Sequence, residues 1–152
     1  MGIGYKDSVV VYNRYAKGPE QYFGTRFDNV RVELTQGANQ KVSGMGDVNA
    51  CIVKIPNTNL PKPYIAPKAW KRLTEEEKVE NFTLDTKSSN FFVIVKKEAL
   101  GIDIDIPTGL VESDESYPNG FFEYVKEQYG YTFSVDTVDV YNLIPRFEIG
   151  GK

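Results

Sequence analysis

The side chains of this sequence that could carry out chemistry are mainly carboxylates. Asp103 and Asp105 alternate with isoleucines in the stretch 101–107, which places both acids on one face of an extended segment. Carboxylate oxygens are the ligands that divalent cations such as Ca²⁺ prefer, and three further acids follow between positions 112 and 115. The pair is therefore a candidate metal site, although its spacing is not that of an EF-hand loop and a solvated acidic strand explains the same pattern.

A second group of acids, Glu75 to Glu77, is predicted to begin a helix and not to form an active site. Thr74 and Glu77 have the spacing of a capping box, and carboxylates stabilise the positive end of a helix. We expect one or two helical turns within 67–81, anchored to the sheet by Trp70.

The groups that most catalytic sites need are missing from the sequence. There is no histidine, which removes the commonest general base, the Ser-His and Cys-His nucleophiles and most zinc sites. The single cysteine, Cys51, lies among apolar residues and is expected to be buried and inert. Gly44-Met45-Gly46-Asp47 lacks the spacing of a phosphate-binding loop. We expect a non-enzymatic protein that needs no cofactor.

Length and composition indicate one domain, 1–152. The chain has 152 residues, of which 41% are hydrophobic, enough for one core. It has no run of about eighteen apolar residues and no secretion signal, so we expect no membrane partner and a chain made and used in the cytosol. The net charge of −3 argues against a surface that reads nucleic acid sequence, because such surfaces are basic.

The stretch from Phe27 to Pro56 organises the predicted fold. Apolar and polar residues alternate from Val30 to Thr35, and Ala50 to Ile55 is again extended, so these segments are predicted to pair. The connection between them is too long for a tight hairpin turn. We predict a projecting loop, 36–48, with the candidate residues Gly37, Asn39, Gln40, Lys41, Gly44, Gly46 and Asp47.

The remaining elements complete a mainly β protein. Strands are expected at 8–12, 91–96 and 101–107, with a turn near Gly18-Pro19 and Gly24. The strand at 91–96 is apolar on both faces, so it should be central and covered on both sides, or should meet another subunit. A helix is expected at 118–129, capped by Asn119 and stopped by Gly130. The C-terminal strands should contain a bulge at 136–137, and Pro145 should confine strand 146–149 to an edge or to a place after a turn. About six strands and two short helices predict a small antiparallel β-barrel or open sandwich.

Several segments, taken in order, resemble those of small minor capsid proteins encoded by tailed phages of Gram-positive bacteria, a group similar to the head-tail joining, or stopper, proteins of the virion neck. They are GIGYKDSVVVYNRY, FDNVRVE, GANQKVSGMGD, a KIP strand end, KPYIAPKAW, NFFVIV and YTFSVDTVDVYNLIPRFEIGGK. The resemblance covers nearly the whole chain, and its motifs are short and structural.

The resemblance implies a virion structural protein, assembled in the host cytoplasm, that closes the DNA-filled head and attaches the tail. Its partners would be copies of itself in a ring, twelvefold or sixfold, a portal-side adaptor, a tail terminator or tail tube protein, and double-stranded DNA that passes without sequence recognition. A loop narrows the channel in that group, which assigns this role to 36–48. The C-terminal tail, 141–152, is expected to dock onto a neighbouring layer through Arg146, Phe147, Glu148 and Ile149.

Two other functions remain open from the sequence. A tail terminator or other collar protein of the same particle would share much of this pattern. A small-ligand or carbohydrate-binding β module would use Trp70, the many tyrosines and the pair Asp103 and Asp105. A carboxylate-only enzyme such as a glycoside hydrolase ranks last, because no acid pair is placed across a cleft.

Overall fold

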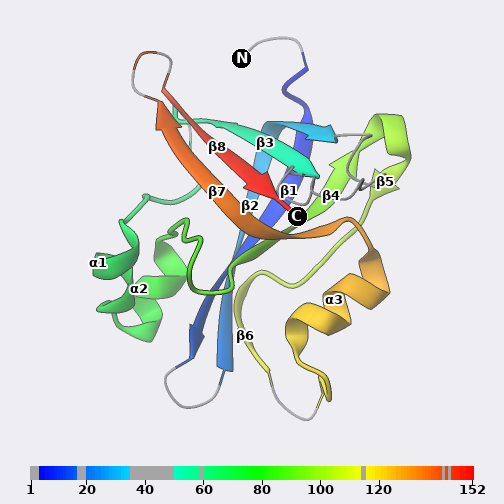
Figure 1. The fold of residues 1–152 in the computed structure, drawn as a ribbon. Helices are drawn as coiled ribbons and strands as arrows, with labels where there is room; N and C mark the ends of the chain where they lie inside the picture. Colours follow the sequence, from blue (N-terminus) through cyan, green and yellow to red (C-terminus); the bar gives the residue numbers. More distant parts are fainter. Residues whose placement is uncertain are drawn as a thin grey trace, which may run out of the picture.

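The computed structural model describes residues 4–16, 20–34, 50–58, 60–113, 116–141, 143 and 145–152 and has a mainly antiparallel β fold with short helices (Figure 1). The strands are β1 (Asp7–Ala16), β2 (Glu20–Leu34), β3 (Cys51–Pro56), β4 (Phe91–Lys97), β5 (Ile102–Asp103), β6 (Gly109–Glu112), β7 (Thr132–Tyr141) and β8 (Arg146–Gly151). The helices are α1 (Pro67–Lys71), α2 (Glu75–Glu80), the 3-10 turn η2 (Glu98–Leu100) and α3 (Phe121–Tyr129).

The main strand pairings form a closed circuit that begins and ends at β1. β1 pairs with β2 and with β4, β2 continues to β3, β3 to β8, β8 to β7, and β7 back to β4. β5 extends from β4 and β6 from β2, and all these pairs are antiparallel. The predicted fold class, mainly antiparallel β with short helices, is therefore confirmed, with eight strands in place of six.

Strands β1 and β4 are buried on both faces. Val9 and Val11 belong to a core inside the circuit of strands, whereas Val10 and Tyr12 belong to a second core on the opposite face. β4 divides in the same way, with Phe92 in the first core. The prediction that 91–96 is a central strand covered on both sides is confirmed.

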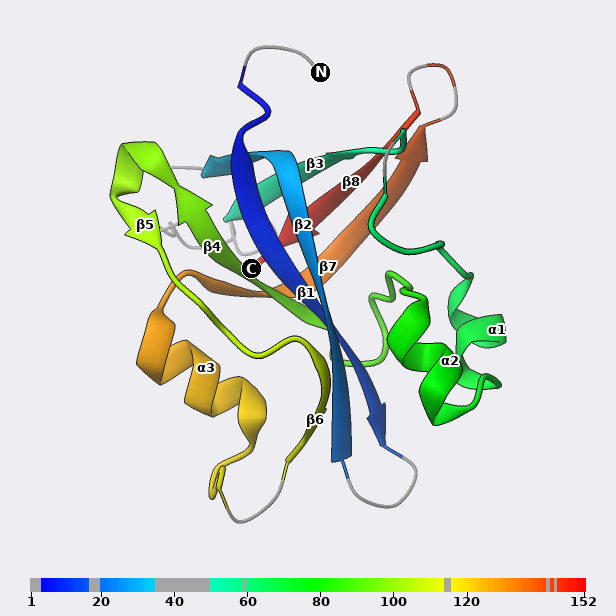
Figure 2. The same ribbon diagram turned by 180° about the vertical axis from the view of Figure 1, so that it is seen from behind.

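The second core is covered by α3 and by the segment that leads through β6 (Figure 2). The ring of Phe121 from α3 lies 5.1 Å from the ring of Tyr12, which also stacks on Phe91 at 4.9 Å. Aromatic pairs at such distances contribute beyond the area that they bury. Gly130 ends α3 with a positive φ of 69°, as predicted, but the helix begins after Gly120 and not after an Asn119 cap.

Of the predicted turn residues, Gly18-Pro19 lie outside the described residues, between the register partners Ala16 and Glu20. The prediction of a turn at Gly24 is wrong, because β2 begins at Glu20 and runs through this glycine. Gly24 pairs with Tyr12, and a Cβ at position 24 would lie 2.7 Å from the ring of that tyrosine. The glycine therefore permits a close approach within a long hairpin and does not mark a reversal of the chain.

The prediction of a strand over 101–107 is largely wrong. Only Ile102 and Asp103 pair, with Lys97 and Lys96 at the end of β4. The alternation of this stretch arises because Ile104 and Ile106 pack against the second core while the chain passes toward β6. Periodicity alone did not distinguish this extended covering segment from a paired strand.

Helices α1 and α2 form as predicted. Thr74 Oγ1 accepts a hydrogen bond from Glu77 N at 3.2 Å, and Thr74 N donates to Glu77 Oε1 at 3.0 Å, which completes the capping box. Trp70 is buried against Phe23 at 5.5 Å between ring centroids, so α1 is anchored to β2. The predicted bulge in β7 also appears, as a register shift between Val135 and Thr137.

Substitution Gly151→Ala is expected to lower the free energy of unfolding by about 1 to 3 kcal/mol. A Cβ at this position in β8 would lie 2.6 Å from the ring of Phe92 and 2.8 Å from Phe133 Cβ, and both rings are packed. Urea denaturation measures the change. Asp139→Ala, at an exposed site of the neighbouring strand, is the control and should change the free energy by less than about 0.5 kcal/mol. Equal stability of the Gly151 variant and the wild type would contradict the tight packing.

Candidate functional site

The predicted channel loop, 36–48, lies outside the residues that the structure describes, and so do all its candidate residues. These are Gly37, Asn39, Gln40, Lys41, Gly44, Gly46 and Asp47. What the structure describes is the pair of strands from which this connection starts and to which it returns.

The two strand ends that hold this connection are adjacent and firmly anchored. Leu34 at the end of β2 is the register partner of Cys51 at the start of β3, and Val32 is the partner of Val53. Ala50 N donates a hydrogen bond to the carbonyl of Gly151 at 2.7 Å. Residues 35–49 are therefore carried by neighbouring strands of the main sheet.

Cys51 is part of this anchor and not a reactive group. Its side chain is buried in the first core. Burial raises the pKa of the Cys51 thiol to about 12, because the thiolate would lose its hydration. The thiol is therefore expected to act as a small apolar side chain, as the sequence predicts.

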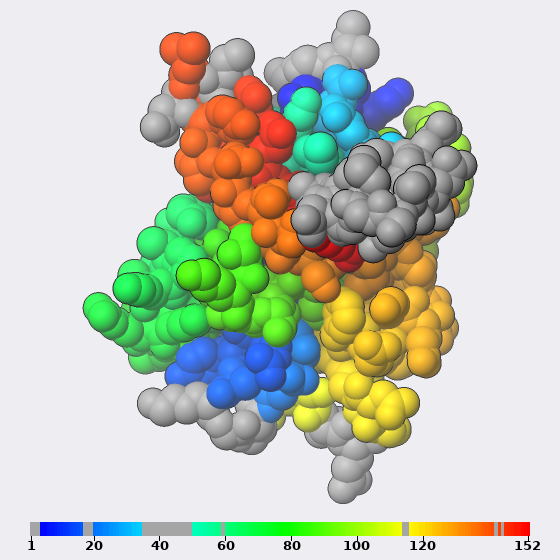
Figure 3. Space-filling view, in the orientation of Figure 1, coloured from blue at the N-terminus to red at the C-terminus, as the bar shows by residue number. Residues whose placement is uncertain are grey.

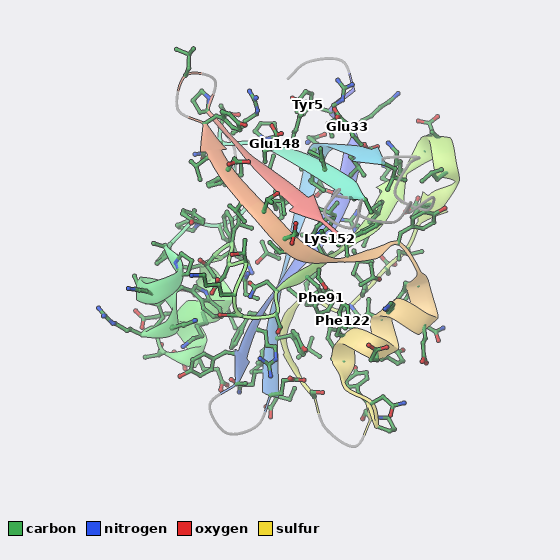
Figure 4. The ribbon with its side chains drawn as sticks, in the orientation of Figure 1. Tyr5, Glu33, Phe91, Phe122, Glu148 and Lys152 are labelled. Carbon is green, nitrogen blue, oxygen red and sulfur yellow. The ribbon has the colours of Figure 1, made fainter. Side chains whose placement is uncertain are left out.

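The outer face of β2, β3, β8 and β7 carries charged side chains, among them Glu33 and Glu148 (Figure 4). Arg31, Lys54, Glu148 and Asp139 follow one another across the four strands. Glu33 Oε2 lies 2.9 Å from Arg31 Nε and 3.3 Å from Lys54 Nζ. Such partly exposed pairs contribute little to stability, so this face is a hydrated polar surface.

A partly buried ion pair lies beside this face. Asp7 Oδ2 accepts a hydrogen bond from Val32 N at 2.9 Å and lies 3.2 Å from Lys97 Nζ, which in turn donates to the Val32 carbonyl at 3.0 Å. Both side chains line a cavity of about 690 Å³ together with Lys6 and Arg31. The pair joins β1, β2 and β4 where the register of β1 shifts between Asp7 and Val9. Because Asp7 and Lys97 both bond to the backbone of Val32, we assign the pair a structural role.

A second cavity, of about 480 Å³, lies between α3 and the segment that precedes β4. Arg14, Glu20 and Tyr22 line it, as does Phe122 from α3. Arg14 Nε lies 2.6 Å from Glu20 Oε2, so the two charges are paired. Burial, with a smaller contribution from Glu20, raises the pKa of Tyr22 to about 12. The phenol of Tyr22 therefore stays protonated, and the carboxylate of Glu20 is paired with Arg14. These groups suit polar contacts better than acid–base catalysis.

The structure does not gather the acids of 101–107 into a metal site. Asp103 and Asp105 are exposed, and Asp103 is the register partner of Lys96. In the described ranges, no three His, Cys, Asp or Glu side chains lie close enough together to hold a metal ion.

The structure places strand 146–149 after a turn, one of the two positions predicted for it, and buries two of its four predicted docking residues. β8 pairs with β3 on one side and β7 on the other, so it is a central strand. Phe147 and Ile149 are 1% and 0% exposed in the first core, and they are not free to dock on another protein. Arg146 and Glu148 lie on the polar outer face, 3.4 Å apart. Pro145 lies in the turn before β8, so it removes no hydrogen-bond donor from the strand.

The exposed apolar side chains at the turn between β7 and β8 were not predicted from the sequence. Leu143 is 97% exposed, and the adjoining Val140 and Tyr141 also face solvent. The available signal was an apolar residue between Asn142 and Pro145, in a context typical of a turn. In contrast, Trp70 is 1% exposed, so it cannot stack on a sugar at the surface.

Comparison with known proteins identifies one family. The model of a family of unknown function (DUF6751) matches residues 5–152. No curated protein matches the chain. No solved structure matches it either.

Asp7→Ala is expected to lower the free energy of unfolding by about 2 to 3 kcal/mol, because it leaves the partly buried Lys97 ammonium and the Val32 N–H without their acceptor. Asp7→Asn, which keeps one oxygen acceptor, should cost less. The surface variant Glu33→Ala is the control, with an expected change of about 0.5 kcal/mol. Urea denaturation measures all three, and equal losses for Asp7→Ala and Glu33→Ala would contradict a buried role for Asp7.

Cys51 is expected to resist thiol reagents in the folded protein. Its pKa of about 12 leaves little thiolate at pH 8, and burial blocks access, so Ellman's reagent should react only as fast as the protein unfolds. Because the folded pKa lies above the unfolded one, the contribution of Cys51 to stability is full below the ordinary thiol pKa and falls as pH rises above it. Rapid labelling of the native protein at pH 8 would contradict this placement.

Proposed function

The chain belongs to this family of unknown function, and we propose that it is a structural protein of the phage neck, a head-tail joining protein of the stopper type. In this role copies of the chain form a ring that closes the DNA-filled head and provides the platform for the tail. The protein is not an enzyme and needs no cofactor.

The observation that carries the proposal is the anchorage of residues 35–49. These residues connect Leu34 to Ala50, next to the register pair Leu34 and Cys51, on a scaffold whose strand pairings form a circuit. A hairpin connection of two to five residues is usual, and loops much longer than about twelve residues are commonly functional. A firm scaffold with a long connection at adjacent strand ends suits a part that reaches into a channel.

The charges of the chain agree with a DNA conduit that does not read sequence. The net charge is −3, and the outer face of the sheet carries acids and bases that pair with each other. A bore lined by many unpaired Lys and Arg side chains would hold the phosphate backbone tightly. The proposed loop residues include only Lys41 as a cation, which favours passage over binding.

The proposed partners follow from a place between head and tail. They are other copies of the chain, a portal-side adaptor, a tail terminator or tail tube protein, and double-stranded DNA in the lumen. The proposed location is the neck of the virion, after assembly in the host cytoplasm. None of the helices that the structure describes has the length and apolar character needed to span a membrane.

A tail terminator or another collar protein of the same particle is the alternative, since the same scaffold suits either layer. The carbohydrate-binding alternative has lost one of its main supports, because Trp70 packs against Phe23 and Tyr15 in the interior.

Shortening the connection tests the proposal in a phage that encodes the chain. In a variant with residues 36–48 replaced by Asn-Gly, the scaffold should still enter the particle, but packaged DNA should leak. We expect a large fall in the fraction of filled heads seen by negative-stain microscopy, with the variant chain still present in purified virions by mass spectrometry. Wild-type chain supplied in trans should restore filled heads.

The same experiment separates the alternatives. A chain that is absent from purified virions would exclude a neck role. Filled, tailed and infectious particles made with the shortened chain would exclude the stopper role and leave the collar alternative.

A further inference from the structure

The cavity of about 480 Å³ beside α3 is built from four parts of the chain that lie far apart in the sequence. They are the β1–β2 hairpin, the turn before β4, the helix α3 and the start of β7. Figure 3 shows these parts, in blue, green, yellow-orange and orange, next to one another on one face of the molecule. The volume lies within the range of small-molecule sites, roughly 300 to 1,000 Å³.

The inner part of this cavity presents an amide whose orientation is fixed by the backbone. Thr83 N donates a hydrogen bond to Asn13 Oδ1 at 3.1 Å, so Nδ2 is the donor end of the Asn13 amide. Asn13 Nδ2 donates to Asn90 Oδ1 at 2.6 Å, which makes Nδ2 the other end of the Asn90 amide. Asn90 lines the cavity and is 2% exposed, and among the described residues its Nδ2 has no acceptor. A buried amide donor that is held in this way is available to a ligand.

The charged wall of the cavity is neutral as a unit. Arg14 and Tyr22 are register partners in the hairpin, and Arg14 Nε lies 2.6 Å from Glu20 Oε2. The Tyr22 hydroxyl interacts with both charged groups. An anionic ligand would meet Glu20, and a cationic ligand would meet Arg14. The wall offers N–H donors and carboxylate acceptors side by side, which suits a hydroxyl group because a hydroxyl both donates and accepts.

The other charges of the lining do not make this an ion site. Lys87 is exposed to solvent, where water and salt weaken its attraction for an anion. Glu20 is the single acid among the described lining residues. No group of three metal-ligating side chains occurs in the part of the chain that the structure describes. We therefore expect an uncharged ligand.

Phe122 and Val135 give the cavity an apolar surface. Val135 is 5% exposed and belongs to the first core. The half-buried ring of Phe122 packs edge to face on Phe91, with 4.9 Å between the ring centroids, and Lys126 Nζ lies 5.7 Å from its centre. These contacts hold the ring in place, and the part of it that they leave uncovered lines the cavity. Apolar groups of a ligand gain free energy by covering such a surface.

A ligand that matches this lining carries several hydroxyl groups, has C–H groups on one face and has no net charge. A single sugar ring combines these properties. We propose that the cavity binds a neutral sugar ring, with hydroxyl groups bonded to Asn90 Nδ2 and to the Arg14 and Glu20 pair. The C–H groups of the sugar lie against Phe122. This site goes beyond the proposed neck role and does not depend on it, and it shares no residue with the carbohydrate site considered from the sequence.

Saturation-transfer difference NMR on the full chain tests the proposal, because this method detects weak ligands whatever the oligomeric state of the protein. The probes are D-glucose, D-galactose, D-mannose and N-acetyl-D-glucosamine, each at about 1 to 50 mM, which covers the Kd of about 1 to 10 mM expected for one sugar ring. At least one sugar should show saturable transfer, strongest at its ring C–H protons. Sodium acetate at the same concentrations should show none.

Two variants locate the binding in this cavity. Ser134→Trp fills the cavity from an exposed position of β7 and should abolish sugar binding. Glu20→Gln removes the carboxylate partner of Arg14, so it should weaken sugar binding about tenfold and allow acetate to bind. The control is Glu33→Gln, which changes the charge equally at another partly exposed acid paired with an arginine, and it should alter the sugar affinity by less than about twofold.

The thermal unfolding midpoint shows whether each variant is folded, and if one cavity variant unfolds, the other decides. The proposal is overturned if none of the four sugars binds, or if acetate binds the wild type as tightly as a sugar does. It is also overturned if the folded cavity variants keep the wild-type sugar affinity, or if Glu33→Gln loses as much affinity as Glu20→Gln. None of these results depends on whether the chain is found in virions, so they leave the neck role to its own test.

Discussion

The fold depends on covering both faces of β1 and β4. Val9 and Val11 lie on one face of β1, Val10 and Tyr12 on the other, and all four are buried. A sheet of this kind cannot leave one side in water without exposing large apolar side chains. The circuit through β2, β3, β8 and β7 covers one face, and β6 and α3 cover the other.

This arrangement determines where polar chemistry is possible. Buried polar side chains are used to join strands, as Asp7 does with Lys97, and the charged residues of the outer face pair with each other. Among the described residues, the exposed features that other molecules could contact include the β7–β8 hairpin end with Leu143. Exposed apolar side chains of this kind agree with the proposed role, in which the protein works by contact with other macromolecules.

The sequence predicted those elements whose signals are local. Three features were predicted correctly because each depends on neighbours along the chain. They are the run of residues in β4 that is apolar on both faces, the capping box of Thr74 and Glu77, and the end of α3 at Gly130. The same reasoning failed where contacts between residues far apart in the sequence determine the structure. Gly24 was read as a turn although it makes room for Tyr12, and the alternation from 101 to 107 reflects packing on the second core. The pairing of β8 on both sides was not predicted, because it depends on β3, nearly a hundred residues earlier.

The site was less predictable than the fold. The burial of Phe147 and Ile149, and the exposure of Leu143, depend on which strands surround β8, and sequence periodicity does not report this. The anchorage of the long connection was foreseen from the pairing of its flanking strands, because that pairing is local.

The most direct test of the central claim, a firm β scaffold that carries the 36–48 connection toward a channel, is a side-chain-resolution cryo-electron microscopy map of the neck in a virion that encodes this chain. The account predicts a ring of copies in which Leu34 and Cys51 face the axis and the connection between them narrows the lumen. A ring in which these strand ends face outward, or a neck in which this chain has no density, would contradict it.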